Sequence, residues 1–150
     1  MNQRIKIVIA DDHQMLIDGI KSLLKEVENI AIMGSANNGN DALILIEQHS
    51  PDILLSDINM PGMGGLELAR ILKQKHKAVK IISLSMYSDA VVVRDMLQAG
   101  VSGYVLKNTG KEELVDAINK VYGGGVYYSL EISEMMMRNI SIKKEEGATT

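Results

Sequence analysis

Five polar side chains stand directly after apolar runs of the sequence, and together they could handle a phosphoryl group. The runs occupy residues 5–10, 53–56, 80–84 and 104–106, and the polar residues that follow them are Asp11 with Asp12, Asp57, Ser85 and Lys107. A carboxylate such as that of Asp57 can attack phosphorus once a cation neutralises the repulsion between the two anions. An ammonium such as that of Lys107 can pair with Asp57 before the reaction and with a phosphoryl oxygen after it. The sequence therefore predicts an acyl phosphate on Asp57.

The adjacent acids Asp11 and Asp12 predict a divalent cation at the same place. Carboxylate oxygens suit Mg²⁺, and Asn59, two residues after Asp57, could add its backbone carbonyl. Pro61 and the glycines around it predict a tight turn that keeps side chains out of the site. Each residue also has an ordinary interpretation, because Asp near a helix start, Lys at a strand end and Ser in a loop are common. Their order on successive strands is what favours a shared site.

Alternating strands and helices explain why these residues should meet. Apolar periodicity predicts strands at residues 5–10, 30–36, 53–56, 80–84 and 104–106, and helices at 14–27, 41–49, 66–75, 89–99 and 111–122. The strands are continuous Ile, Val and Leu runs, which is typical of parallel strands buried on both faces. We therefore expect an α/β fold, a doubly wound parallel sheet between two layers of helices. Parallel strands share one carboxyl edge, and the ligand crevice of such folds lies outside that edge.

Composition narrows the classes of function. A chain of 150 residues suffices for one domain with a core of its own. The formal charge of −3 argues against direct DNA binding by these residues. The absence of cysteine argues against a disulfide framework or a thiolate metal site. The first residues lack the long apolar stretch of a signal peptide or membrane span, so we expect a cytoplasmic protein without membrane association.

The end of the sequence predicts a linker. Ser129 is placed to cap a helix. The apolar residues of that helix are Leu130, Ile132, Met135, Met136 and Ile140. Residues 141–150 are polar and predict a linker without packed structure. We therefore expect one domain over residues 1–124, followed by a linker helix and polar tail over residues 125–150.

The sequence resembles the receiver domain of bacterial two-component response regulators over residues 4 to about 125. The motifs that carry the resemblance are IVIADDH, LLSDINMPGMGG, ISLSMY and SGYVLKN, the last of which holds Tyr104 and Lys107. ADDH, LSMY and GGGVYYSLEIS are most similar to the LuxR/NarL/FixJ-type transcriptional subfamily. The resemblance implies a flavodoxin-like three-layer (βα)5 sheet with strand order 2-1-3-4-5.

The resemblance also implies a function. Asp57 would accept a phosphoryl group from a sensor histidine kinase, with Mg²⁺ bound by Asp11, Asp12, Asp57 and the carbonyl of Asn59, and with Asp12 as the direct ligand of the acidic pair. Ser85 and Tyr104 would act as a switch that changes the surface of the fourth helix, fifth strand and fifth helix.

The implied output is regulation of transcription. DNA would be bound through a C-terminal helix-turn-helix domain that these residues lack, and a homodimer could form on phosphorylation. Such a receiver catalyses only its own phosphorylation and dephosphorylation.

Two other functions stay open. A stand-alone receiver, acting in a phosphorelay or by protein contact, would share all of this chemistry. A haloacid dehalogenase-like Mg²⁺ phosphatase is less favoured, because the first strand leads into DDH rather than DxD, and Lys107 leads into NTGKEE. A dinucleotide-binding domain is disfavoured because no GxGxxG follows the first strand.

Three positions carry further expectations. Asn108 stands where many receivers have Pro, so a trans peptide is expected after Lys107. Met86 stands where many have Ala, and we expect it to cover part of the switch pocket. His13 is expected to be a surface residue of the first helical turn rather than part of the site.

Overall fold

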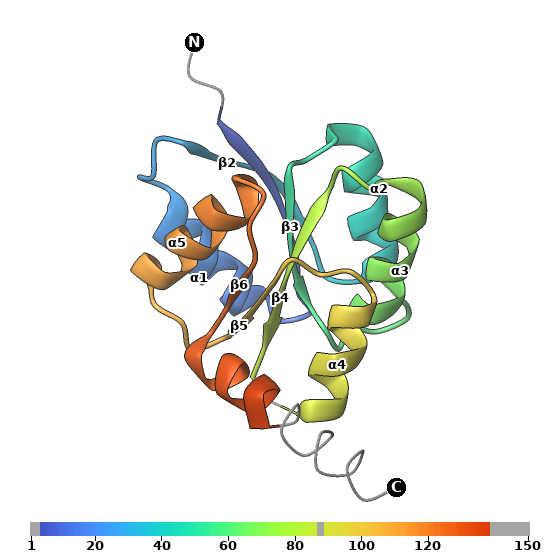
Figure 1. The fold of residues 1–150 in the computed structure, drawn as a ribbon. Coiled ribbons are helices and arrows are strands. Elements are labelled where there is room, and N and C mark those ends of the chain that lie inside the picture. The colour runs from blue at the N-terminus through green and yellow to red at the C-terminus, as the bar shows by residue number, and fades with distance from the viewer. Residues whose placement is uncertain (1–3, 87–88, 139–150) are drawn as a thin grey trace, which may run out of the picture.

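The computed structural model of the protein describes residues 4–86 and 89–138. In that part of the chain one parallel sheet runs through the centre, in the order β2-β1-β3-β4-β5-β6 (Figure 1). The strands are β1 (Ile5–Ala10), β2 (Ile30–Ala36), β3 (Ile53–Asp57), β4 (Lys80–Ser85), β5 (Gly103–Leu106) and β6 (Tyr127–Tyr128). The predicted order 2-1-3-4-5 is confirmed, and β6 is an additional edge strand that the sequence analysis does not predict.

Two layers of helices cover the sheet, as predicted (Figure 1). Helices α1 (Gln14–Leu24) and α5 (Lys111–Tyr122) pack on one face, and α2 (Gly39–His49), α3 (Gly65–Lys75) and α4 (Ala90–Gln98) pack on the other. Alternate residues of β1 supply the two cores: Ile7 and Ile9 face α1 and α5, whereas Val8 faces the other layer. No helix of the described residues is long and apolar enough to cross a membrane.

Two helix ends differ from the prediction by two residues or more, for local reasons. Helix α1 ends at Leu24 rather than at residue 27, because the Val27 amide bonds to the Leu24 carbonyl at 3.1 Å and turns the chain toward β2. Helix α2 begins at Gly39, because the Asn38 side chain caps it by accepting from the Asp41 amide at 2.8 Å.

The C-terminal segment packs against the domain. Tyr127 and Tyr128 pair in parallel with Gly103 and Tyr104 of β5. Residues 130–138 are helical, as predicted, and the buried Ile132 and Met135 join the core on the α4 side of the sheet. Ile140 and the predicted polar tail at residues 141–150 lie outside the described residues. The strand at β6 is only two residues long, which is too short for a periodic pattern to reveal.

Candidate functional site

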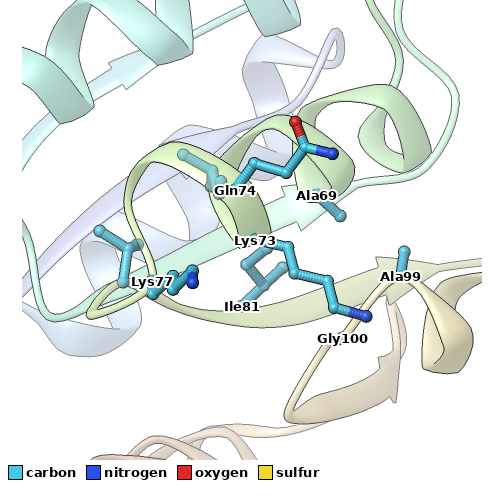
Figure 2. A pocket seen from close by; sticks show the side chains of 9 residues that line it. Ala69, Lys73, Gln74, Lys77, Ile81, Ala99 and Gly100 are labelled. Carbon is cyan, nitrogen blue, oxygen red and sulfur yellow. The ribbon is translucent and has the colours of Figure 1, made fainter.

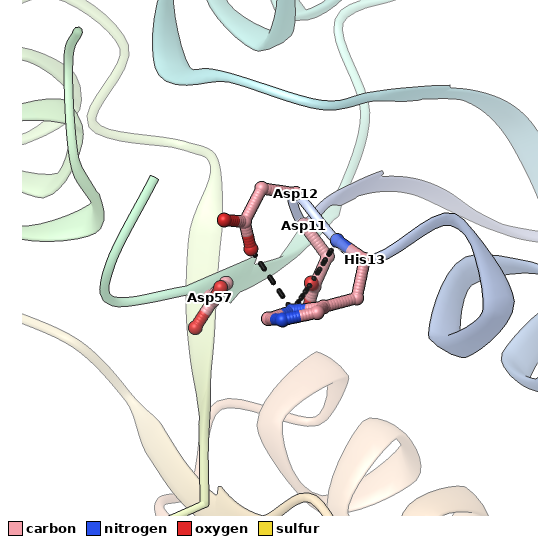
Figure 3. Close-up of side chains that lie close together, drawn as sticks. All are labelled: Asp11, Asp12, His13 and Asp57. Atoms are coloured by element: carbon pink, nitrogen blue, oxygen red, sulfur yellow. Dashed lines mark hydrogen bonds and ion pairs between the residues drawn. The ribbon is translucent and has the colours of Figure 1, made fainter. Parts of the chain in front are cut away.

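The carboxyl edge of the sheet gathers the predicted residues. Asp11 follows β1, Asp57 ends β3, Ser85 ends β4 and Lys107 follows β5. Figure 3 shows three carboxyl groups and one imidazole turned toward one another. Ligand atoms from Asp11, Asp12, His13 and Asp57 all lie within 4.8 Å of one another. The sequence therefore identified a real cluster, and the parallel topology is what assembles it.

Asp11 is fully buried, and both of its carboxylate oxygens have partners. Oδ1 accepts a hydrogen bond from the His13 amide at 2.8 Å, and Oδ2 lies 3.0 Å from Nζ of Lys107. Asn37, just after β2, donates to the Asp11 carbonyl at 3.1 Å and helps to fix this turn. Asp12 is more exposed, and its Oδ1 contacts the His13 ring at 2.9 Å. Asp12 is thus the acid of the pair that is more accessible to a cation from solvent.

Asp57 is buried with Lys107 beside it. Its Oδ1 accepts from the Ile58 amide at 2.7 Å and lies 3.2 Å from Nζ of Lys107. Burial raises the pKa of the Asp57 carboxyl, and the negative charge of Asp11 raises it further. The positive charge of Lys107 acts on this pKa in the opposite direction without cancelling the rise. A cation bound nearby would stabilise the ionised form of such a carboxyl group, which is otherwise costly to form.

The loop after Asp57 folds back closely over the strand end. The Gly65 amide donates to the Ile58 carbonyl at 2.8 Å. A Cβ atom on Gly65 would lie 2.3 Å from the Asp57 carbonyl oxygen, so a larger residue there would displace the backbone of the site. This contact explains one of the glycines that the sequence analysis assigned to a tight turn.

Lys107 bridges the two buried acids. Burial by itself would lower the pKa of its ammonium, but Asp11 and Asp57 outweigh burial, and the pKa lies above its usual value. The Lys107 amide donates to the Ser85 carbonyl at 2.8 Å, which joins the ends of β4 and β5. The sequence analysis expected the contact with Asp57; the equally close contact with Asp11 was not expected.

Tyr104 lies inside the protein rather than at its surface, with 0% of its area exposed. Burial raises the pKa of its phenol, the neighbouring Ser85 side chain lowers it, and the charge of Asp89 raises it. Ser85 is itself buried at the end of β4. The predicted pair of switch residues is therefore close together on one side of the sheet.

Met86 does not cover Tyr104, contrary to expectation. Its side chain is 65% exposed and lines a hollow of about 430 Å³ with His13, Leu16, Lys107 and Asn108. Strand β4 ends at Ser85, and Met86 lies in the bend that follows it. Ser85 neighbours Tyr104, whereas Met86 lines its hollow together with Leu16 of α1.

Three further predictions concern residues at the rim. His13 is 61% exposed, but its Nδ1 contacts Asp11 and Asp12 at 3.0 and 2.9 Å, so its assignment outside the site was wrong. The adjacency of His13 to the acidic pair in ADDH was the signal that could have identified it. Asn59 lies exposed in the loop after β3, and its part in metal binding stays a prediction. The described residues contain no cis peptide bond, in agreement with the trans peptide expected at Asn108.

A separate hollow lies near the opposite edge of the sheet (Figure 2). It measures about 730 Å³ and is lined by the ends of α3 and α4 and the start of β4, including Leu72, Lys73, Ile81 and Gly100. Nζ of Lys73 donates to the Gln98 carbonyl at 3.2 Å, so this lysine satisfies the carboxyl end of α4. None of the acids of the cluster lines this hollow.

Known proteins are similar to this chain in sequence and in fold. The family model described as "Response regulator receiver domain" matches residues 7–119. The response regulator GacA of Pseudomonas aeruginosa is 35% identical over 88% of this chain and 62% of its own length. The transcriptional regulatory protein DegU of Brevibacillus brevis is 35% identical over 90% of this chain and 57% of its own length. The chain therefore spans about three fifths of the length of these relatives.

A solved structure gives the same result for the fold. A two-component response regulator of the LuxR family from Aurantimonas sp. SI85-9A1 superposes with a TM-score of 0.87 at 28% identity. The match covers 93% of this chain and 99% of that one.

Proposed function

This chain belongs to the response regulator receiver domain family, and we propose that it accepts a phosphoryl group on Asp57 from a phosphohistidine of a sensor histidine kinase. The observation that carries the proposal is the ammonium of Lys107 held 3.2 Å from Asp57 and 3.0 Å from Asp11, inside a cluster of carboxylates. The Asp57 carboxyl has a raised pKa, the Lys107 ammonium is a fixed cation beside it, and two further acids lie close by. This combination suits the transfer of a phosphoryl anion to a carboxylate.

The transfer forms one bond to phosphorus and breaks another. An oxygen of the Asp57 carboxylate attacks phosphorus and forms the acyl phosphate bond. The P–N bond to the kinase histidine breaks, its electron pair returns to the imidazole nitrogen, and that nitrogen takes up a proton. Lys107 lies close enough to move from the Asp57 carboxylate to a phosphoryl oxygen, where it neutralises the new charge.

Mg²⁺ is the cofactor that the proposal requires, and when bound it would neutralise the charge that develops on the phosphoryl oxygens. Its ligands would be the carboxylate of Asp57, a carboxylate of the pair Asp11 and Asp12, and the backbone carbonyl of Asn59. The donor set supports this assignment, because three carboxylates reach one point and hard cations prefer oxygen. Asp12 is the proposed direct ligand of the acidic pair, since both oxygens of Asp11 already contact His13 or Lys107.

We further propose that phosphorylation acts through Ser85 and Tyr104. The new phosphoryl group adds about −1.5 to −2 charges and strong acceptor oxygens next to the Ser85 hydroxyl. Movement of Ser85 toward them would change the packing of the buried Tyr104 and with it the surface of α4, β5 and α5. Such a change is a shift between two packings of one core, driven by their different affinities for the phosphoryl group.

The proposed output is regulation of transcription. The relatives are longer than this chain, and one of them is named a transcriptional regulatory protein, which supports a DNA-binding domain following the receiver. In that arrangement residues 1–124 form the receiver, residues 125–150 lead to the output domain, and a homodimer forms on phosphorylation. The receiver would act in the cytoplasm as a signalling domain that catalyses only its own phosphorylation and dephosphorylation.

Intact mass spectrometry tests the chemistry directly. We expect the parent to gain one phosphoryl group from acetyl phosphate in Mg²⁺ and none in EDTA. Asp57→Asn should gain none, whereas Asp18→Asn, a change of an exposed acid on α1, should behave as the parent does. Absence of an adduct in the parent under all conditions would contradict the proposed function.

A further inference from the structure

The hydroxyl of Ser129 joins the C-terminal segment to two elements near the phosphorylation site. It accepts a hydrogen bond from the Leu106 amide at 3.3 Å and donates one to Oε1 of Glu113 at 3.1 Å. Ser129 is only 2% exposed, so water has little access to either hydrogen bond. Leu106 ends β5 immediately before Lys107, and Glu113 lies in the first turn of α5. We call this arrangement of Glu113, Ser129 and the Leu106 amide the Glu113–Ser129 clamp.

Backbone pairing places the clamp in register with β5. The Tyr127 amide donates to the Ser102 carbonyl at 3.0 Å, and the Ser129 amide donates to the Tyr104 carbonyl at 3.0 Å. Burial raises the pKa of the Tyr127 phenol, and the negative charge of Glu113 raises it further, so this carboxylate lies near a second residue of the segment. The segment is thereby fixed along the whole length of β5.

The segment also contributes side chains to the buried cluster that contains the tyrosine of the proposed switch. Ile132 and Met135 of helix 130–138 belong to the same buried cluster as Tyr104, together with residues of α4. In Figure 1 this helix follows β6 at the red end of the chain. A change in the packing of Tyr104 would therefore displace residues 127–138, because close-packed cores transmit displacement.

We propose that Glu113 and Ser129 are positioning residues that hold the end of β5, and with it Lys107. They do so only while residues 127–138 are docked on the domain. Docking of this segment and phosphorylation of Asp57 are therefore coupled. The inference rests on the proposed function. It adds a route by which phosphorylation of Asp57 would affect the C-terminal segment. Lys107 divides its contacts between Asp11 and Asp57, and a phosphoryl group would draw it away from both. That movement pulls on the Leu106 amide, whose bond to Ser129 is the longer of the two in the clamp.

The proposal predicts effects at two places: on the docking of residues 127–138 after phosphorylation, and on the reaction of Asp57, which needs Lys107 in position beforehand. Hydrogen–deuterium exchange of the full chain would follow residues 127–138 in Mg²⁺, with and without beryllium fluoride as a phosphoryl mimic. In the parent, we expect the mimic to speed exchange in this segment at least threefold. Without the mimic, Ser129→Ala and Glu113→Ala, each of which removes one partner of the Ser129–Glu113 hydrogen bond, should speed exchange at least fivefold. The matched control is Glu112→Ala, a change of the exposed neighbouring acid in the same helical turn, which should stay within twofold of the parent.

The second readout is the rate at which acetyl phosphate forms the adduct on Asp57, which a purely structural role of the clamp would leave unchanged. We expect this rate to fall at least threefold in Ser129→Ala and Glu113→Ala, because the end of β5 would no longer hold Lys107 in place before the reaction, and to stay at the parent value in Glu112→Ala. An adduct that forms in the parent and at the same rate in all variants would overturn the coupling and leave the proposed function intact. No adduct in the parent would overturn the proposed function, and this inference with it.

Discussion

The ammonium of Lys107 stabilises two buried carboxylates at once, so we expect Lys107→Met to destabilise the fold strongly when no divalent cation is present. At the observed distances of 3.0 and 3.2 Å, each ion pair is worth about 5 kcal/mol at an effective dielectric constant near 20. The cost of removing these charges from water offsets much of that gain. Removing one partner of such a buried group typically costs about 3 to 5 kcal/mol, because the remaining charge is left uncompensated.

The same reasoning predicts that the effect depends on Asp57. In the parent background, Lys107→Met leaves two carboxylates facing each other, and we expect a loss of about 3 kcal/mol. In the Asp57→Asn background it leaves only Asp11 charged, and we expect the loss to be smaller by about 1 to 2 kcal/mol. The side-chain oxygen that Asp57→Asn retains would still accept the Ile58 amide, so the loop contact is kept.

Urea unfolding followed by far-ultraviolet circular dichroism, at pH 7.5 in EDTA, measures all four members of this cycle. The protein contains no Trp, so a tryptophan fluorescence signal is not an option. Lys77→Met, a change of an exposed lysine in the loop after α3, should alter the free energy of unfolding by less than about 0.5 kcal/mol. A similarly small effect of Lys107→Met, or equal losses in both backgrounds, would refute the view that Lys107 holds two mutually repelling acids together.

Three further predictions concern the fold around the site. Burial and the charge of Asp11 raise the pKa of Asp57, so its contribution to stability is complete below the unfolded-state pKa of 3.8 and is lost as pH rises through the folded-state pKa; Asp57→Asn should therefore stabilise the protein more at pH 7.5 than at pH 3.5, by urea unfolding in EDTA. Gly65→Ala should cost at least about 2 kcal/mol because its Cβ would meet the Asp57 carbonyl at 2.3 Å, whereas Gly110→Ala, with no atom within 4 Å, should cost under about 1 kcal/mol in the same assay. Ile132→Ala should cost about 2 to 4 kcal/mol by thermal or urea unfolding, since Ile132 is fully buried; a loss below about 0.5 kcal/mol would mean that helix 130–138 is not docked in solution.

The sequence predicted the architecture well because each element leaves a local pattern. Continuous apolar runs marked the first five strands, and helical spacing marked the helices between them. Strand alternation with helices then restricts the topology to a parallel sheet with one carboxyl edge. Positions such as Asp57 and Lys107 could be assigned to that edge simply because they follow apolar runs.

Where sequence reasoning failed, the missing information was the direction of a side chain. Met86 was expected to cover part of the switch pocket, but the bend after β4 places it in a hollow with His13 and Leu16 instead. His13 was assigned to the surface, and its ring is indeed exposed, yet its nitrogen contacts two carboxylates of the site. A pattern of residue types does not contain these directions.

The sequence by itself determined which residues could do chemistry and that one edge of the sheet would collect them, because both follow from local periodicity and from the parallel arrangement it implies. The tertiary structure alone decided that Lys107 lies as close to Asp11 as to Asp57, and that Ser129 hydrogen-bonds to Glu113 and to the Leu106 amide. These contacts join segments that are 16 to 96 residues apart in the chain. They depend on how separate elements pack against one another, and packing is a property of the assembled core rather than of any segment.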